Sequence, residues 1–312
     1  MAITAPTTTS DFAGFIKPDQ AAGIFDQAAR QSVVQGLAQR VALGASGQDI
    51  PIVTGKPTAN WTGEGQRKHS SKGSMTLLPM KPEKLTSIVV VSAETVRANP
   101  GGYVTNIRGQ LAEAFAIAFD LAALHNTGGD GTGTGPFDRY IDQTTKSVEL
   151  GTGSQASGGI YADLNSALRL LVNDGKKLRG WALDDTAEPT LNSAVDLNGR
   201  PLFVESPYDG SALDSGRLLR RPALYAEGIG TDVVVGTPNT GGIVGYGGDW
   251  TQAAWGAVGG ISYRVSTEAT VTINGELVSL FENNLVAILA EAEYGFVVND
   301  TEAFVKLTNH TA

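Results

Sequence analysis

Apolar residues recur at every fourth position in the segment 18–41, which follows a Thr/Ser-rich leader. This spacing predicts one amphipathic helix, and Pro18-Asp19 is a helix-start signal. The apolar stripe is narrow, so it favours docking on another surface over forming a core of its own. The stripe consists of Phe25, Ala29, Val33, Leu37 and Val41.

Two runs rich in β-branched residues follow, at 49–54 and 74–94, with a Gly/Ser-rich segment between them. The pattern predicts a long two-stranded arm. Pro79 and Pro82 confine its second strand to an edge or a bulge, which suits a projecting ribbon. Isolated two-stranded ribbons are only marginally stable in water, so we expect this arm to need a partner surface.

The segment 99–127 predicts the strongest helix of the chain, with Asn99 as a cap candidate and Pro100 at the first helical position. From Leu111 onward it is apolar around most of its circumference, so it should run through a core. A glycine loop at 128–136 follows it.

Beyond this loop we expect a helix over 160–178 and short strands in a compact α/β unit up to about residue 262. The short strand-like runs lie at 181–185, 201–205, 232–236 and 241–246. The tail has longer strand-like runs, which lie at 263–273, 285–298 and 303–308.

Charge is distributed unevenly along the 312 residues, whose net charge is −9. Residues 1–92 carry nine basic and six acidic side chains, whereas residues 93–312 carry fourteen and twenty-six. A net acidic protein is a poor candidate for a dedicated nucleic-acid binder. The two parts are complementary, so either they fold against each other or the basic part of one copy lies on the acidic part of another.

The basic residues of the first part gather in the arm. Arg67, Lys68 and Lys72 stand in the Gly/Ser-rich segment, and Trp61 precedes them. Trp together with Arg and Lys is typical of an interface anchor. In the tail, Glu291 and Glu293 alternate onto one strand face. We interpret this pair as a solvated acidic face or as a partner for a basic segment, and not as a catalytic carboxylate pair.

We expect no catalytic, cofactor-binding or metal-binding residues. The glycines at 128–136 follow a helix, whereas a dinucleotide fingerprint follows a strand. No two of the three histidines are spaced as a metal pair, and the chain has no cysteine. No signal peptide or membrane-spanning stretch is indicated, because the longest apolar stretch is interrupted by Glu113 and Asp120. A soluble protein made in the cytoplasm is expected.

The order of these parts resembles the major capsid protein of tailed phages, the Hong Kong ninety-seven type fold. The resemblance covers nearly the whole chain from about residue 18. It is carried by "IPIVTGKPTANWTGEG", "LTSIVVVSAE", "GDGTGTGP" and "FENNLVAILAEAEYGFVVNDTEAFVKL" taken in order.

The resemblance implies an α+β fold and a shell protein. Its copies would form pentamers and hexamers of an icosahedral head that encloses double-stranded DNA. The implied parts are an N-terminal arm at 1–48, an extended loop at 49–92, a peripheral-domain spine helix at 93–127, an axial domain at 128–262 and peripheral strands at 263–312. The extended loop would reach over an adjacent subunit, with Trp61, Arg67, Lys68, Lys72, Glu291 and Glu293 as inter-subunit contacts.

The resemblance also implies partners and a location. They are other copies of the chain, a portal, packaged DNA through weak non-specific contact, and in some members a decoration protein, with assembly in the host cytoplasm and a final place in the virion. No membrane partner is expected. The chain begins close to the arm, so we expect a separate scaffolding protein and removal of at most a few N-terminal residues.

Some members of the family crosslink themselves, through a loop lysine that attacks an asparagine amide near a glutamate. Asn284 and Glu291 fall on the matching positions of the tail, and Lys68 or Lys72 would supply the amine. The Asn-to-Glu spacing also resembles members without a crosslink. Two other functions stay open: a nanocompartment shell on the same fold, and an enzyme with a site at Asp184, Asp185 and Arg221.

Overall fold

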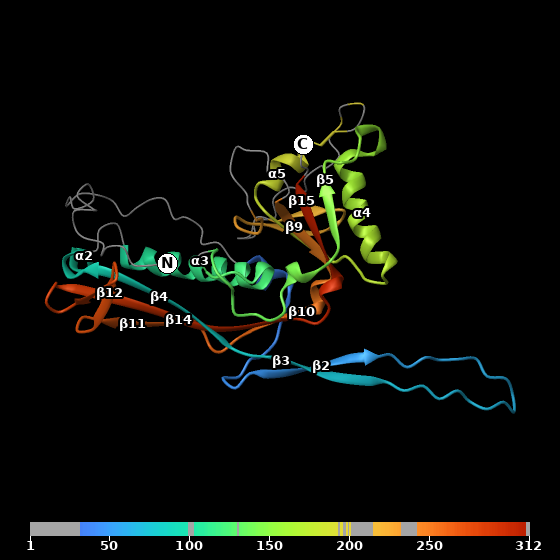
Figure 1. The fold of residues 1–312 in the computed structure, drawn as a ribbon, viewed down its shortest axis with the longest axis horizontal. Helices are drawn as coiled ribbons and strands as arrows, with labels where there is room; N and C mark the ends of the chain where they lie inside the picture. Colours follow the sequence, from blue (N-terminus) through green and yellow to red (C-terminus); the bar gives the residue numbers. More distant parts are fainter. Residues whose placement is uncertain are drawn as a thin grey trace.

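The computed structural model combines helices with two larger sheets and a projecting two-stranded ribbon (Figure 1). This architecture confirms the α+β fold class. Most of the expected N-terminal helix, the cap candidate Asn99, Pro100 at the expected first helical position, and the runs at 201–205 and 232–236 lie outside the described residues. Those described are 32–98, 103–129, 131–192, 194, 195, 198, 200, 215–231 and 242–309.

A five-stranded sheet is built around one long strand, β14 (Leu285–Val298). On one edge of β14 lies β4 (Glu83–Ser92), antiparallel to it. On the other edge lie β11 (Ser262–Ser266) and β10 (Ala253–Ala257), and β1 (Gln39–Arg40) extends the sheet beside β10. β14 therefore holds together segments from both halves of the chain.

The helix α3 (Tyr103–His125) covers one face of this sheet (Figure 1). Its 23 residues span about 35 Å at the α-helical rise. Its buried residues recur at helical spacing and pack on the even-numbered side chains of β14, as expected for a helix that runs through a core. They include Ile107, Leu111, Phe115 and Phe119.

A second sheet has six strands in the order β5-β15-β9-β6-β8-β7. The buried face of α4 packs on it, and α5 lies at its side. The bounds are β5 (Ser147–Leu150), β15 (Phe304–Asn309), β9 (Ile243–Gly248), β6 (Gly180–Leu183), β8 (Arg221–Tyr225), β7 (Ser215–Leu218), α4 (Gly159–Asn173) and α5 (Ala187–Asn192).

Several predicted elements differ in extent. The expected strand at 263–273 is two strands, because β11 pairs with β14 whereas β12 (Thr270–Ile273) pairs with β13 (Glu276–Ser279) through a turn at Asn274 and Gly275. Both turn residues have positive φ, 53° and 86°, as a tight hairpin turn requires. The last strand, β15, lies in the six-stranded sheet and not beside β14.

The N-terminal helix is also shorter than its pattern predicts. α1 (Val33–Leu37) ends before Ala38, and the chain then becomes extended because β1 pairs with β10. The remaining short helices are α2 (Ala93–Ala98) and the 3-10 turns η3 (Ile141–Gln143), η4 (Gln155–Ser157), η5 (Trp250–Gln252) and η6 (Thr301–Ala303).

A buried carboxylate fixes α1 on α3. Asp120 of α3 has no solvent exposure and accepts hydrogen bonds from the Ser32 hydroxyl at 2.6 Å and from the Val33 and Val34 amides at 3.0 and 3.2 Å. A carboxylate at a helix N-terminus satisfies amides that have no partner within the helix. The point where the N-terminal segment meets the body is thus set by one side chain of α3.

A second, partly buried contact joins the end of α3 to the six-stranded sheet. His125 Nε2 lies 2.9 Å from the Ile229 carbonyl, which accepts its hydrogen, so Nδ1 accepts the hydrogen of the Tyr246 hydroxyl at 3.0 Å. Burial is the largest influence and lowers the pKa of His125, although Ile229 and Asp142 favour the charged form. The junction therefore holds a neutral imidazole.

Replacing the buried anchor should destabilise the fold. Asp120→Ala leaves buried donors without acceptors, so we expect the free energy of unfolding to fall by about 2–4 kcal/mol. Urea denaturation of the unassembled chain measures this loss. The exposed Asp138→Ala is the matched control and should change the free energy by less than about 0.5 kcal/mol. Equal effects of the two variants would contradict the anchor role.

Acid should weaken the fold through His125. The folded-state pKa lies below the ordinary 6.5, so on acidification the unfolded chain binds a proton first. The contribution of His125 is fully present above pH 6.5 and is lost as the pH falls from 6.5 through the folded-state value. Urea midpoints measured across this range should decline less in His125→Gln than in the parent. His69→Gln, at an exposed position, should keep the full decline, and an unchanged decline in His125→Gln would refute the assignment.

Candidate functional site

The projecting ribbon is an antiparallel hairpin, formed by β2 (Gln48–Gly55) and β3 (Ser74–Met80). It confirms the predicted two-stranded arm, except that the arm ends at Met80. Residues 83–92, expected in the same strand, instead pair with β14 as β4. Between β2 and β3 runs the loop 56–73, here called the tip loop, in which every residue is exposed. The ribbon extends away from the body (Figure 1).

The two faces of the ribbon have different surroundings. On the inner face, Ile50, Leu78 and Met80 pack near Leu43 and Val297, so the base of the ribbon is fixed on the outer face of β14. The outer face has no such cover. Its apolar side chains are largely exposed, with 56% of Val53, 66% of Met75 and 61% of Leu77 accessible to solvent.

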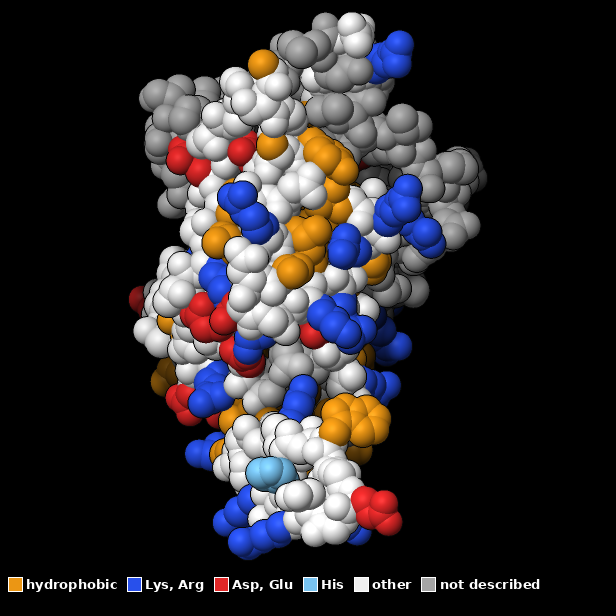
Figure 2. Space-filling view, turned by 90° about the vertical axis from the view of Figure 1, so that its right-hand side faces the viewer, with side chains coloured by type: hydrophobic (Ala, Val, Ile, Leu, Met, Phe, Trp, Pro, Cys, Tyr) orange, Lys and Arg blue, Asp and Glu red, His pale blue; other side chains and the backbone are white. Residues whose placement is uncertain are grey.

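The tip loop carries the residues singled out from the sequence. The Trp61 side chain is fully exposed, and Arg67, Lys68 and Lys72 are exposed as well. Figure 2 shows Lys and Arg side chains gathered at this end of the molecule, next to a hydrophobic side chain. A solvated indole leaves a large apolar surface in water, which is the usual state of an interface anchor before binding. The structure brings these four residues together on one loop.

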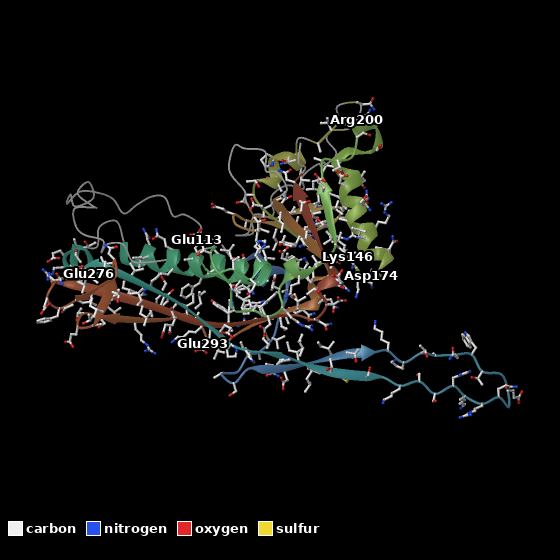
Figure 3. All side chains as sticks on the ribbon, viewed as in Figure 1. Glu113, Lys146, Asp174, Arg200, Glu276 and Glu293 are labelled. Carbon is white, nitrogen blue, oxygen red and sulfur yellow. The ribbon has the colours of Figure 1, made fainter. Side chains whose placement is uncertain are left out.

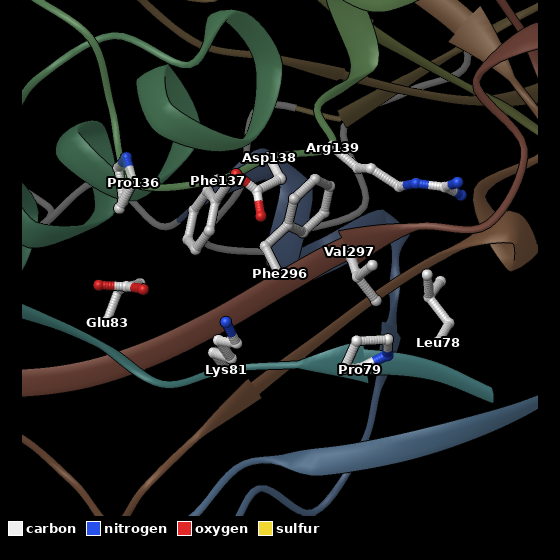
Figure 4. Close-up of a pocket in the computed structure, with 10 residues that line it drawn as sticks. All are labelled: Leu78, Pro79, Lys81, Glu83, Pro136, Phe137, Asp138, Arg139, Phe296 and Val297. Atoms are coloured by element: carbon white, nitrogen blue, oxygen red, sulfur yellow. The ribbon is translucent and has the colours of Figure 1, made fainter.

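At the base of the ribbon, the chain turns from β3 into β4 beside a cavity of about 280 Å³ (Figure 4). The cavity lies between this turn, the loop after α3 and the end of β14. Gly295 is required here, because a Cβ at this position would lie 2.8 Å from Met80 and 2.9 Å from the Lys81 carbonyl. The residues around the cavity are Leu78, Pro79, Lys81, Glu83, Pro136, Phe137, Asp138, Arg139, Phe296 and Val297.

The outer face of β14 is covered at both ends and open in the middle. Leu285 and Ala287 lie in one cluster with the β12–β13 hairpin, and Val297 lies under the base of the ribbon. Between these covers, Glu291 and Glu293 are half-buried. In Figure 3 Glu293 lies in this middle region, whereas Glu276 lies at the far end of the body.

Glu291 is already engaged within its own chain. Its carboxylate lies 2.6 Å from Lys84 Nζ and 3.6 Å from Arg264, both on neighbouring strands. The hydrogen bond from Lys84 is the largest influence and lowers the pKa of Glu291. The middle of this face therefore carries basic as well as acidic side chains. Whether Glu291 and Glu293 receive a neighbouring subunit stays a prediction.

The groups of the hypothetical crosslink are not assembled within one chain. The Asn284 amide donates a hydrogen bond to Glu94, and Asn284 is seven residues from Glu291 along an extended segment, about 23 Å at the strand rise. Lys68 and Lys72 lie on the tip loop, at the opposite end of the molecule (Figure 1). Any such site would have to combine groups from different copies.

The residues of the enzyme hypothesis have structural partners. Asp184 is buried and accepts hydrogen bonds from Thr186 and from the Gly230 amide, and Arg221 donates to the carbonyls of Leu178 and Leu219. Within the described residues, no group of three side chains is arranged to hold a metal ion. In that same part of the chain, no helix is long and apolar enough to cross a membrane.

Sequence reasoning missed two apolar features. One is the apolar outer face of the ribbon. The alternation of apolar with polar residues, Val53 with Thr54 and Met75 with Thr76, could have predicted it. The other is the segment 265–284, here called the distal segment, where Leu277 is 78% and Phe281 is 77% exposed. The sequence feature that could have revealed the distal segment is the presence of apolar residues among carboxylates in a stretch without any Lys or Arg.

Comparison with known proteins places this geometry in a family. A model described as the phage capsid family matches residues 13–309. The chain is 44% identical over 316 residues to the "probable major capsid protein gp17" of Mycobacterium phage L5, covering 98% of this chain and 92% of that protein. It is 25% identical to the major capsid protein of Staphylococcus phage 80alpha, over 81% of this chain and 72% of that protein.

Solved structures agree in fold. A chain from Gordonia phage Cozz has a TM-score of 0.73 at 26% identity, covering 97% of this chain and 94% of its own. A chain from Mycobacterium phage Adephagia has a TM-score of 0.72 at 15% identity over 99% of both chains, which shows the fold alone. Given the family match over nearly its whole length and the relative at 44% identity, the chain belongs to the phage capsid family.

Proposed function

We propose that this chain is the major capsid protein of a tailed phage. Its copies assemble into pentamers and hexamers that close into an icosahedral head around double-stranded DNA. The relatives are named as major capsid proteins, and the fold is shared over almost the full length. Shell building requires each copy to offer surfaces that only another copy completes, and the ribbon is such a surface.

The observation that carries this proposal is the ribbon with its uncovered side chains. The outer face of β2 and β3 exposes Val53, Met75 and Leu77, and the tip loop exposes Trp61. A two-stranded ribbon of this kind is marginal in water, so a second surface is needed to stabilise it. In a shell, each copy receives the ribbon of a neighbour, and many weak contacts add up to a stable assembly.

The remaining partners are those that the family resemblance implies. They are a separate scaffolding protein, a portal through which DNA enters and, in some members of the family, a decoration protein. Packaged DNA would be held by weak, non-specific contact, because the net charge of −9 opposes strong binding to phosphates. Assembly takes place in the host cytoplasm, and the finished protein resides in the virion.

The other two functions have less support. A nanocompartment shell would need the same ribbon, but the relatives are named as phage capsid proteins. An enzyme with a site at Asp184 and Arg221 would need those side chains free to act, whereas both hold backbone groups in place. Neither alternative explains the observations better than a capsid does.

Removing the tip loop should prevent assembly without unfolding the chain. Replacement of residues 56–73 by Asn-Gly shortens the hairpin without removing any buried side chain, so the free energy of unfolding should change by less than about 1 kcal/mol. Negative-stain microscopy and sizing chromatography, with each chain expressed alone and together with its scaffolding protein, should show shells for the parent chain and only small oligomers or monomers for the variant. Normal shells from the variant would contradict the role of the ribbon, and a parent chain that remains a 32.5 kDa monomer under both conditions would contradict the proposed function.

The crosslink hypothesis has its own test. We expect assembled particles to run as single chains on a denaturing gel, because Glu291 is engaged by Lys84 and the Asn284 amide is engaged by Glu94 within the same chain. Bands at multiples of the chain mass would show a crosslink. Their loss in Asn284→Ala, with no change in Asn283→Ala, would assign the crosslink to Asn284.

A further inference from the structure

Three polar side chains meet where α3 ends against the six-stranded sheet. His125 is the last residue of α3, Tyr246 lies on β9, and Asp142 lies in η3. Tyr246 has no solvent exposure, and its ring centroid lies 5.6 Å from that of His125. Because α3 covers the five-stranded sheet and β9 belongs to the six-stranded sheet, these side chains link the two sheets.

The single hydrogen of the Tyr246 hydroxyl has two acceptors within reach. One is His125 Nδ1, 3.0 Å away, which can only accept because Nε2 carries the hydrogen that is donated to the Ile229 carbonyl. The other is the Asp142 carboxylate. Burial raises the pKa of Tyr246 most, and the charge of Asp142 together with a hydrogen bond to this carboxylate raises it further. One hydroxyl hydrogen serves one of these acceptors at a time.

While the hydroxyl serves His125, the Asp142 carboxylate is incompletely satisfied. Its Oδ1 atom is buried and has no hydrogen-bond partner. Lys306 Nζ lies 2.9 Å from this atom, but it donates its hydrogen bond to the Asp142 backbone carbonyl, also at 2.9 Å. Lys306 is paired with Tyr246 in the β15–β9 ladder. Since a buried acceptor without a donor costs free energy, a hydroxyl that turned toward Asp142 would be stabilised there.

A proton on His125 makes this turn possible. When Nδ1 carries a hydrogen it becomes a donor, and the Tyr246 oxygen 3.0 Å away can accept from it. The hydroxyl hydrogen is then available to Asp142. We propose that His125, Tyr246 and Asp142 form a proton-operated switch at the junction of the two sheets, in which uptake of one proton by His125 Nδ1 turns the Tyr246 hydroxyl from His125 to Asp142. The proton comes from solvent, and no other covalent bond changes.

The charged groups around His125 set the direction of the switch. Burial is the largest influence and opposes the imidazolium, and the positive charge of Lys306 on β15 opposes it as well. The Ile229 carbonyl and the negative charge of Asp142 favour the imidazolium. The switch therefore rests in the neutral state at pH 7 and operates on acidification. It concerns the folded chain itself, so its failure would leave the proposed function intact.

Nuclear magnetic resonance can observe the switch directly, because the chain has only three histidines, His69, His125 and His310. The unassembled full chain would be labelled with nitrogen-15 in histidine alone, and the signals missing in His125→Gln would identify His125. At neutral pH we expect a hydrogen on Nε2 and none on Nδ1. As the pH falls below 6.5, Nδ1 should take up a proton while the chain remains folded.

A pair of substitutions distinguishes the switch from a simple effect of charge. Asp142→Ala should lower the pH at which His125 takes up its proton, because the carboxylate favours the imidazolium. In a Tyr246→Phe background the same substitution should have an effect at least about twofold smaller, because the hydroxyl that connects the two groups is gone. An equal effect in both backgrounds would contradict the switch. The exposed Asp138→Ala is the matched control and should leave the protonation of His125 unchanged.

Hydrogen exchange followed by mass spectrometry tests the link between the sheets. After correction for the intrinsic exchange rate at each pH, the amides at the end of α3 and in residues 226–231 should stay protected in the parent on both sides of the His125 transition. Asp142→Ala should reduce this protection roughly three- to tenfold, and only on the acidic side, because neutral His125 holds Tyr246 without Asp142.

Two results would overturn the proposal. Loss of protection in the parent on acidification would show that the proton breaks the junction and does not turn the hydroxyl. Unfolding of the parent before His125 takes up its proton would show that the folded chain has no protonated junction.

Discussion

The whole arrangement depends on β14, a single strand of 14 residues with different neighbours on its two faces. Its even-numbered side chains pack on α3 and form the core. Its odd-numbered side chains meet the β12–β13 hairpin at one end and the base of the ribbon at the other. Because β14 fixes both, the ribbon and the distal segment are held apart at the two ends of one rigid sheet.

This separation leaves large apolar side chains exposed at both ends of one folded chain. Trp61 is exposed on the tip loop, and Leu277 and Phe281 are exposed on the distal segment at the opposite end. The fold is stabilised elsewhere, by α3 on the sheet, by the Asp120 anchor and by the His125 junction. The ribbon can therefore remain uncovered without unfolding the body, and it remains available to another copy.

The sequence was sufficient for the long, periodic elements. The spacing along α3, the apolar run of β14 and the hairpin around the Gly/Ser-rich segment were all predicted. The sequence was insufficient where strand pairing between distant segments determines where an element ends or which sheet it joins. The break after Met80, the extended chain at Gln39 and the place of β15 all follow from strand partners far away in sequence. Likewise, composition identified the basic tip around Trp61, but only the β4–β14 register shows that Lys84 reaches Glu291.

The most direct measurement of the central claim is a cryo-electron microscopy map of the assembled particle, in which the ribbon can be traced from its base to its tip. We expect continuous density for residues 56–73 against an adjacent copy, with the indole of Trp61 enclosed. A ribbon folded back on its own body, or standing free in solvent in a closed shell, would contradict this arrangement.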